Sequence, residues 1–137
     1  MNDEMRVRWG WLKAMYIYTL VGAGEFGLGM VLVPQVSQTL FSWPVEEPIA
    51  FRTVGSIYVA FGLLSILGLW APLKFLPVLL LQLCYKMVWF IAVFLPLALT
   101  THVPDYGRIL ALIFASYIVG DLIAIPFAHL IATGTER

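Results

Sequence analysis

The chain has 137 residues, of which 61% are hydrophobic and only 12% are charged, with eight basic residues balancing eight acidic ones. A soluble domain with so few charged residues would expose large apolar patches, so the composition excludes an ordinary soluble protein and predicts embedding in a lipid bilayer. The absence of a net positive charge argues against a nucleic-acid partner. We expect one integral membrane domain covering residues 1–137.

Four segments are long and apolar enough to cross a membrane, for which about 20 residues per helix are needed. We place these spans at residues 14–33, 49–70, 75–99 and 109–132. Because lipid offers no hydrogen-bond partner to free backbone groups, the spans must be helical. The predicted fold class is therefore all-α, a four-helix transmembrane bundle. The apolar run of the first span is too long for a signal peptide, so we expect it to be retained.

The basic residues predict the orientation of the bundle. One side of the membrane carries the two termini and the link between the second and third spans, and its basic residues are Arg6, Arg8, Lys13, Lys74 and Arg137. The other side carries Arg108, with Arg52 at the boundary. Since Lys and Arg concentrate on the cytoplasmic side, we expect both termini in the cytoplasm and a multi-pass protein of the inner (plasma) membrane.

The link between the first two spans, "PQVSQTLFSWPVEEP" at residues 34–48, is less polar than a solvated loop. Three interpretations are open. The link is an ordinary loop resting on the lipid headgroups, a short amphipathic element in the interface, or a re-entrant lid over a cavity.

Each predicted span contains at least one ionisable residue at or inside its boundary, and the four that concern us are Glu25, Arg52, Lys86 and Asp121. An isolated charge near the bilayer centre costs at least about 2.5–3.5 kcal/mol. The four charges sum to zero, so we expect them to face one another, with Arg52 reaching inward from the outer side. Gln82 lies one helical turn before Lys86, and Tyr117 lies one turn before Asp121. The predicted intramembrane polar site is Glu25, Arg52, Gln82, Lys86, Tyr117 and Asp121.

The spacing of residues along the chain predicts two further helix faces. In the first span, Tyr18, Gly22, Glu25 and Gly29 follow at intervals of four, three and four, which predicts one common face. In the fourth span, small residues recur every four positions and predict close helix packing. These residues are Ser116, Gly120, Ala124, Ala128 and Ala132.

The charged constellation has three interpretations: ion pairs that only fix helix register, a polar pocket for a ligand, or a path for protons or ions. The sequence contains no motif of a membrane enzyme, so we assign no catalytic residue and no cofactor. His102 and His129 lie at different depths, which argues against a shared metal site.

The chain resembles the small four-helix bacterial membrane proteins grouped around DoxX. The likeness covers nearly the whole chain and rests on length, four spans, short links and the glycine-rich stretches "VGAGEFGLG" and "VGSIYVAFGLL". This resemblance implies a bacterial inner-membrane accessory or binding protein, in a group linked to quinone-associated oxidoreductases. Glu25 stands where we would look for a basic residue, so no functional residue is carried over.

We therefore expect a non-enzymatic module that binds a lipid-like or quinone-like molecule, or a membrane protein partner, around the buried charges. The alternative is a small proton- or ion-coupled transporter. Four spans are few for a transporter, so this alternative predicts a homo-oligomer.

Overall fold

The computed structural model describes residues 7–44 and 48–134, and within these residues it is helical, without a strand. Four helical segments are long and apolar enough to cross a membrane: Trp9–Leu32, Pro48–Trp70, Leu76–Thr100 and Asp105–Ala124. The all-helical fold and the four candidate spans are thereby confirmed. Arg6 and Arg137, which entered the orientation prediction, and residues 45–47 of the first link lie outside the described residues.

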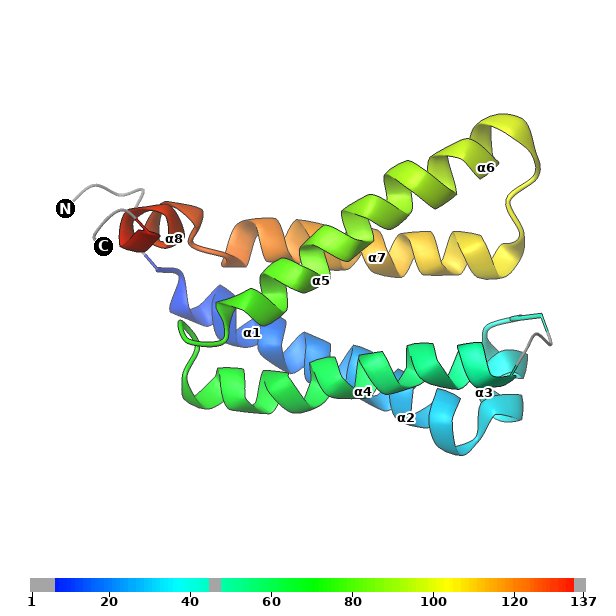
Figure 1. Cartoon of the computed structure of the whole chain (residues 1–137), viewed down its shortest axis with the longest axis horizontal. Helices are drawn as coiled ribbons and strands as arrows, with labels where there is room; N and C mark the ends of the chain where they lie inside the picture. The colour runs from blue at the N-terminus through cyan, green and yellow to red at the C-terminus, as the bar shows by residue number, and fades with distance from the viewer. Residues whose placement is uncertain (1–6, 45–47, 135–137) are drawn as a thin grey trace.

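The spans form two pairs that diverge from one end of the molecule (Figure 1). The first span comprises α1 (Trp9–Thr19), η2 (Leu20–Gly24) and α2 (Glu25–Leu32), and it packs along α4 (Pro48–Trp70). The third span comprises α5 (Leu76–Trp89), η3 (Phe90–Phe94) and α6 (Leu95–Thr100), and α5 packs against α7 (Asp105–Ala124). Contacts between α1 and α7 join the pairs near the termini, whereas α2 and α6 point apart.

Glycines set the close contact between the first and second spans. A Cβ atom built on Gly62 would lie 2.7 Å from Cα of Gly24, and one built on Gly27 would lie 2.6 Å from the carbonyl oxygen of Gly55. No larger residue fits at these points without moving a backbone. Close backbone approach of this kind is how helices associate in lipid, where burial of apolar surface gives little driving force.

The fourth span ends earlier than the sequence predicts. Helix α7 stops at Ala124 because Ile125 adopts an extended conformation (φ −71°, ψ 122°) before Pro126, and a residue that precedes proline disfavours the helical region. A separate helix, α8 (Phe127–Gly134), follows. The predicted range 109–132 is corrected accordingly, and the small-residue stripe is divided, with Ala128 and Ala132 on α8.

The link after the first span is a packed element. Helix α3 (Pro34–Leu40) begins at its proline and packs against α2, where the Ser37 side chain is buried close to Gly29. The Phe41 ring lies 4.5 Å from the Phe26 ring of α2, centroid to centroid. The ordinary-loop interpretation is therefore wrong for residues 34–41, which form a short helix and its packed end.

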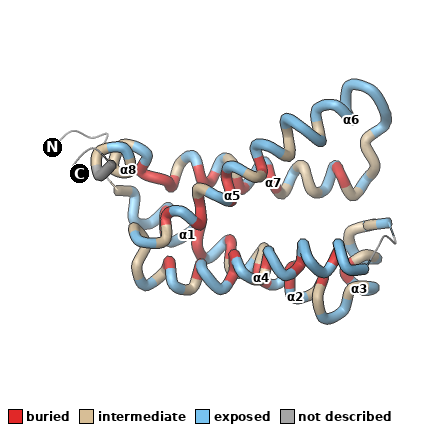
Figure 2. The backbone as a smooth tube through the Cα atoms, viewed as in Figure 1, coloured by how far each residue is buried: buried red, intermediate tan, exposed pale blue. Residues whose placement is uncertain are grey.

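Buried side chains gather where α1, α5 and α7 meet, near the termini (Figure 2). The buried members of this core are Leu12, Met15, Tyr16, Leu76, Leu79, Leu83, Tyr117, Ala124 and Ile125. Segments η3 and α6, in contrast, bury no residue. The bundle is thus closed at the end that carries the termini. At the opposite end it is open between the two helix pairs, because the buried residues Met30, Phe51 and Tyr58 belong to the first pair alone.

We expect Tyr16→Phe to lower the free energy of unfolding by about 1 kcal/mol, the usual net contribution of one hydrogen bond. The Tyr16 hydroxyl donates to the carbonyl of Pro72 at 2.7 Å and thereby ties α1 to the α4–α5 link. Denaturant unfolding in detergent micelles measures the change. Ile17→Val, at a half-exposed position next in the chain, is the matched control and should leave the unfolding curve unchanged.

Candidate functional site

A chain of buried polar side chains connects three spans at one depth. The carboxylate of Asp121 on α7 accepts from Nε2 of Gln82 on α5, with distances of 3.1 and 3.4 Å to its two oxygens. Oε1 of Gln82 in turn accepts from the Thr19 hydroxyl of α1 at 3.2 Å. All three residues are 0% exposed. The contacts satisfy groups that would otherwise be costly to bury in an apolar interior.

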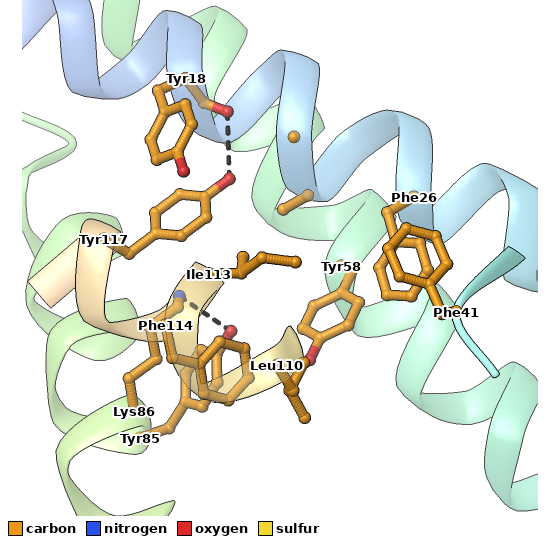
Figure 3. A pocket seen from close by; sticks show the side chains of 12 residues that line it. Tyr18, Phe26, Phe41, Tyr58, Tyr85, Lys86, Leu110, Ile113, Phe114 and Tyr117 are labelled. Carbon is orange, nitrogen blue, oxygen red and sulfur yellow. Dashed lines mark hydrogen bonds between the residues drawn. The ribbon is translucent and has the colours of Figure 1, made fainter. Parts of the chain in front are cut away.

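Lys86 lies one turn further along α5 and is 2% exposed. Its Nζ donates to the hydroxyl of Tyr85 at 3.0 Å. The same Nζ lies 4.4 Å from the ring centroid of Tyr85, 4.3 Å from that of Tyr117 and 5.3 Å from that of Phe114. These distances fall within the range of cation–π attraction. The ammonium group is therefore held in an aromatic cage (Figure 3).

Lys86 and Asp121 attract each other electrostatically without direct contact. No ion pair within 4.0 Å joins them in the part of the chain that the structure describes. The oxygens of Asp121 accept hydrogen bonds from Gln82. Lys86 has three N–H donors and makes one hydrogen bond within the described residues, to Tyr85. Lys86 thus keeps donor capacity for another acceptor.

The caged lysine borders a cavity of about 250 Å³, which is lined by residues of both helix pairs. Its lining residues come from every span and are predominantly aromatic or aliphatic: Tyr18, Gly22, Ala23, Phe26, Phe41, Tyr58, Tyr85, Lys86, Leu110, Ile113, Phe114 and Tyr117. Lys86 is the one charged residue among them (Figure 3). The cavity therefore combines apolar walls with a single cationic group.

The wall nearest the first span is shaped by Tyr117. Its ring stacks on that of Tyr18, with centroids 4.2 Å apart, and its hydroxyl donates to the Tyr18 carbonyl at 3.1 Å. The Tyr18 carbonyl lies just before the π-helical turn η2, and the hydroxyl also lies against Gly22 inside that turn. A side chain inserted at a widened turn is a known way to perturb a helix. Gly22 makes room, since a Cβ there would overlap the Tyr117 hydroxyl.

Of the six residues predicted for the polar site, the structure brings four together: Gln82, Lys86, Tyr117 and Asp121. Glu25 on α2 and Arg52 on α4 are both exposed. Neither side chain has a hydrogen bond or ion pair within the described residues. Their predicted convergence with the other four is therefore wrong.

The π-helical turn explains the error for Glu25. A regular spacing of 3.6 residues per turn places Tyr18 and Glu25 on one face. The turn η2 contains about one extra residue, which rotates α2 by roughly 100° relative to α1. Tyr18 and Gly22 consequently line the cavity, whereas Glu25 faces outward. Glu25 also lies six residues beyond Thr19, or ~9 Å along the helix axis from the polar chain.

Sequence reasoning missed Thr19 and the aromatic members of the cage, Tyr85 and Phe114. A signal for Tyr85 was present, because tyrosines of membrane proteins concentrate at the two interfaces and this one lies deep in a span beside a lysine. A tyrosine at that depth needs a hydrogen-bond partner, and Lys86 provides it.

Comparisons with known proteins identify no relative of this chain. No family model, no curated protein and no solved structure matches this chain. The resemblance to the DoxX-like proteins stays a prediction. Among the described residues, no group of three or more His, Cys, Asp or Glu side chains is arranged to hold a metal ion.

Proposed function

We propose that the protein is a non-enzymatic membrane module that binds a small lipid-like or quinone-like molecule in the cavity beside Lys86. The observation that supports this proposal most is the combination of apolar aromatic walls with one cationic group that retains donors. Ligand sites in proteins commonly have this composition, in which apolar walls give affinity and a few polar groups give orientation.

The chemistry of Lys86 narrows the ligand class. A lysine ammonium only donates hydrogen bonds, so the ligand must present an acceptor such as a carbonyl or carboxylate oxygen. A volume of about 250 Å³ suits a single ring or a short acyl segment, below the range typical of whole drug-sized ligands. We propose that the rest of the molecule extends between the diverging helix pairs into the lipid.

We also propose that the closed end of the bundle faces the cytoplasm, in the inner (plasma) membrane. Lys13 of α1 and Lys74 of the α4–α5 link lie at this end and are exposed. Their placement follows the rule that basic residues collect on the cytoplasmic side. The open end and its cavity would then be reached from the outer half of the bilayer.

The binding test measures quenching of tryptophan fluorescence by decylubiquinone, since the Trp89 ring lies 5.0 Å from that of Phe114 in the cavity wall. A parallel titration with oleate tests a carboxylate ligand by competition. Lys86→Met should weaken binding of either probe about tenfold or more, because a hydrogen bond to a charged group is lost. Lys74→Met removes an exposed lysine outside the spans and should leave the affinity unchanged.

A second uncharged variant separates binding from folding. The double substitution Lys86→Met with Asp121→Leu removes both buried charges and should stay folded while still failing to bind the probe. Saturable binding that survives in this double variant would contradict the proposal. The proposal would also be contradicted if neither probe bound saturably to the unaltered protein.

The buried Asp121 favours one alternative, proton- or ion-coupled transport, because carboxylates near a lysine inside a membrane can relay protons. Proteoliposomes that contain a trapped pH-sensitive dye test it directly. Transport predicts a proton flux that Asp121→Asn abolishes. A flux equal to that of protein-free liposomes rejects the alternative and leaves the binding proposal in place.

A further inference from the structure

Glu25 stands on an outward-facing stripe of the first span. Its neighbours on this stripe are Val21, Leu28 and Leu32, which are 51%, 48% and 71% exposed. Glu25 precedes the end of α2 by seven residues, or ~10 Å of helix. That distance exceeds the reach of a glutamate side chain, so its carboxyl group lies at the depth of the hydrocarbon. Ionisable side chains at such depth almost always face protein or water.

The exposed surface of the third span at this depth differs in composition. Val88 lies six residues beyond Gln82 on α5, just as Glu25 lies six residues beyond Thr19 on α1, and Thr19 and Gln82 are hydrogen-bonded to each other. The exposed side chains of that part of the third span, Met87, Val88 and Ile91, are apolar and suit lipid. Of these two faces, the one that carries Glu25 therefore requires a polar partner.

We infer that a second copy of this chain covers the Glu25 face, with the two Glu25 carboxyl groups meeting across a twofold axis. Such an axis along the membrane normal brings identical residues together at identical depth. A carboxyl group that carries a proton both donates and accepts, which makes this side chain self-complementary. Interhelical polar contacts of this kind join helices in lipid.

Disulfide cross-linking in native membranes tests the inferred dimer. In a Cys84→Ser background, Val21→Cys and Leu28→Cys should each give a covalent dimer upon mild oxidation. Val88→Cys, at matched depth and with 62% exposure, should stay monomeric. Equal cross-linking at position 88, or none at 21 and 28, would overturn the inference. A covalent product with a different protein through position 28 would overturn it as well.

The role of the carboxyl group is tested by the affinity between copies, measured by energy transfer between labelled molecules diluted into liposomes. Glu25→Leu should raise the dissociation constant about three- to tenfold, the range of polar contacts between membrane helices. Glu25→Gln retains a donor and an acceptor and should dimerise nearly as well as the unaltered chain. An unchanged dissociation constant for Glu25→Leu, or a trimer in place of a dimer, would show that the acid pair is not the contact.

Discussion

Asp121→Ala is expected to lower the free energy of unfolding by about 3 kcal/mol or more, the cost of breaking a buried charge pair from one side. Two groups lose their partner in this variant. The amide of Gln82 loses the acceptor that it contacts at 3.1 Å, and the Lys86 ammonium loses the opposite charge that attracts it. Unfolding in mixed micelles of increasing denaturing-detergent fraction provides the measurement.

The double variant Lys86→Met with Asp121→Leu should recover much of this loss, because apolar residues that replace both charges leave neither uncompensated. Leu122→Ala provides the matched control, since it alters the next residue of α7 at a position that is 52% exposed. The cycle also needs the single variants Lys86→Met and Asp121→Leu. If their losses simply add in the double variant, the two side chains are not coupled and the expected result is wrong.

Gly62→Leu should be the most damaging substitution in the second span, with a loss of about 3 kcal/mol or more in the free energy of unfolding. Overpacking of a tight core costs about 1–3 kcal/mol when side chains can give way. Here the obstacle is backbone, since even a Cβ would approach Cα of Gly24 to 2.7 Å. The first and second spans must then separate.

The same substitution should also weaken ligand binding, because Gly22, Ala23 and Phe26 of the cavity wall belong to the displaced segment. Ala60→Leu lies two residues earlier on an exposed part of α4 and should change neither the unfolding transition nor the binding curve. Similar unfolding curves for the two variants would mean that the glycine contact does not limit the packing of these spans.

The sequence predicts the number of spans well, because a span is recognised by its length and apolarity. These two properties do not depend on how the helices pack. It predicts Gln82, Lys86, Tyr117 and Asp121 as neighbours because α5 and α7 are regular helices over those residues. The early end of α7 follows from Pro126, a residue visible in the sequence but embedded in a continuous apolar run. Hydropathy alone therefore extended the fourth span too far.

The position of Glu25 depends on information that local sequence does not hold. The π-helical turn before it is occupied by the hydroxyl of Tyr117, 92 residues further along the chain. An argument from periodicity assumes the same rotation about the helix axis for every residue. It therefore cannot detect a turn that a tertiary contact has widened. Each position after the turn is rotated by the same angle, which is why the error affects the whole outward face of α2.

At the open end, one aromatic residue reconnects the diverging halves. The ring of Trp43 lies 5.7 Å from that of Phe51 on α4 and 5.2 Å from that of Tyr106 at the start of α7, centroid to centroid. Trp43 thus bridges α4 and α7 through aromatic contacts. Tyr58 and Leu110 of the cavity wall lie only about two turns and one turn further along these helices. A smaller side chain at position 43 would remove this bridge at the end of the cavity where the helix pairs separate.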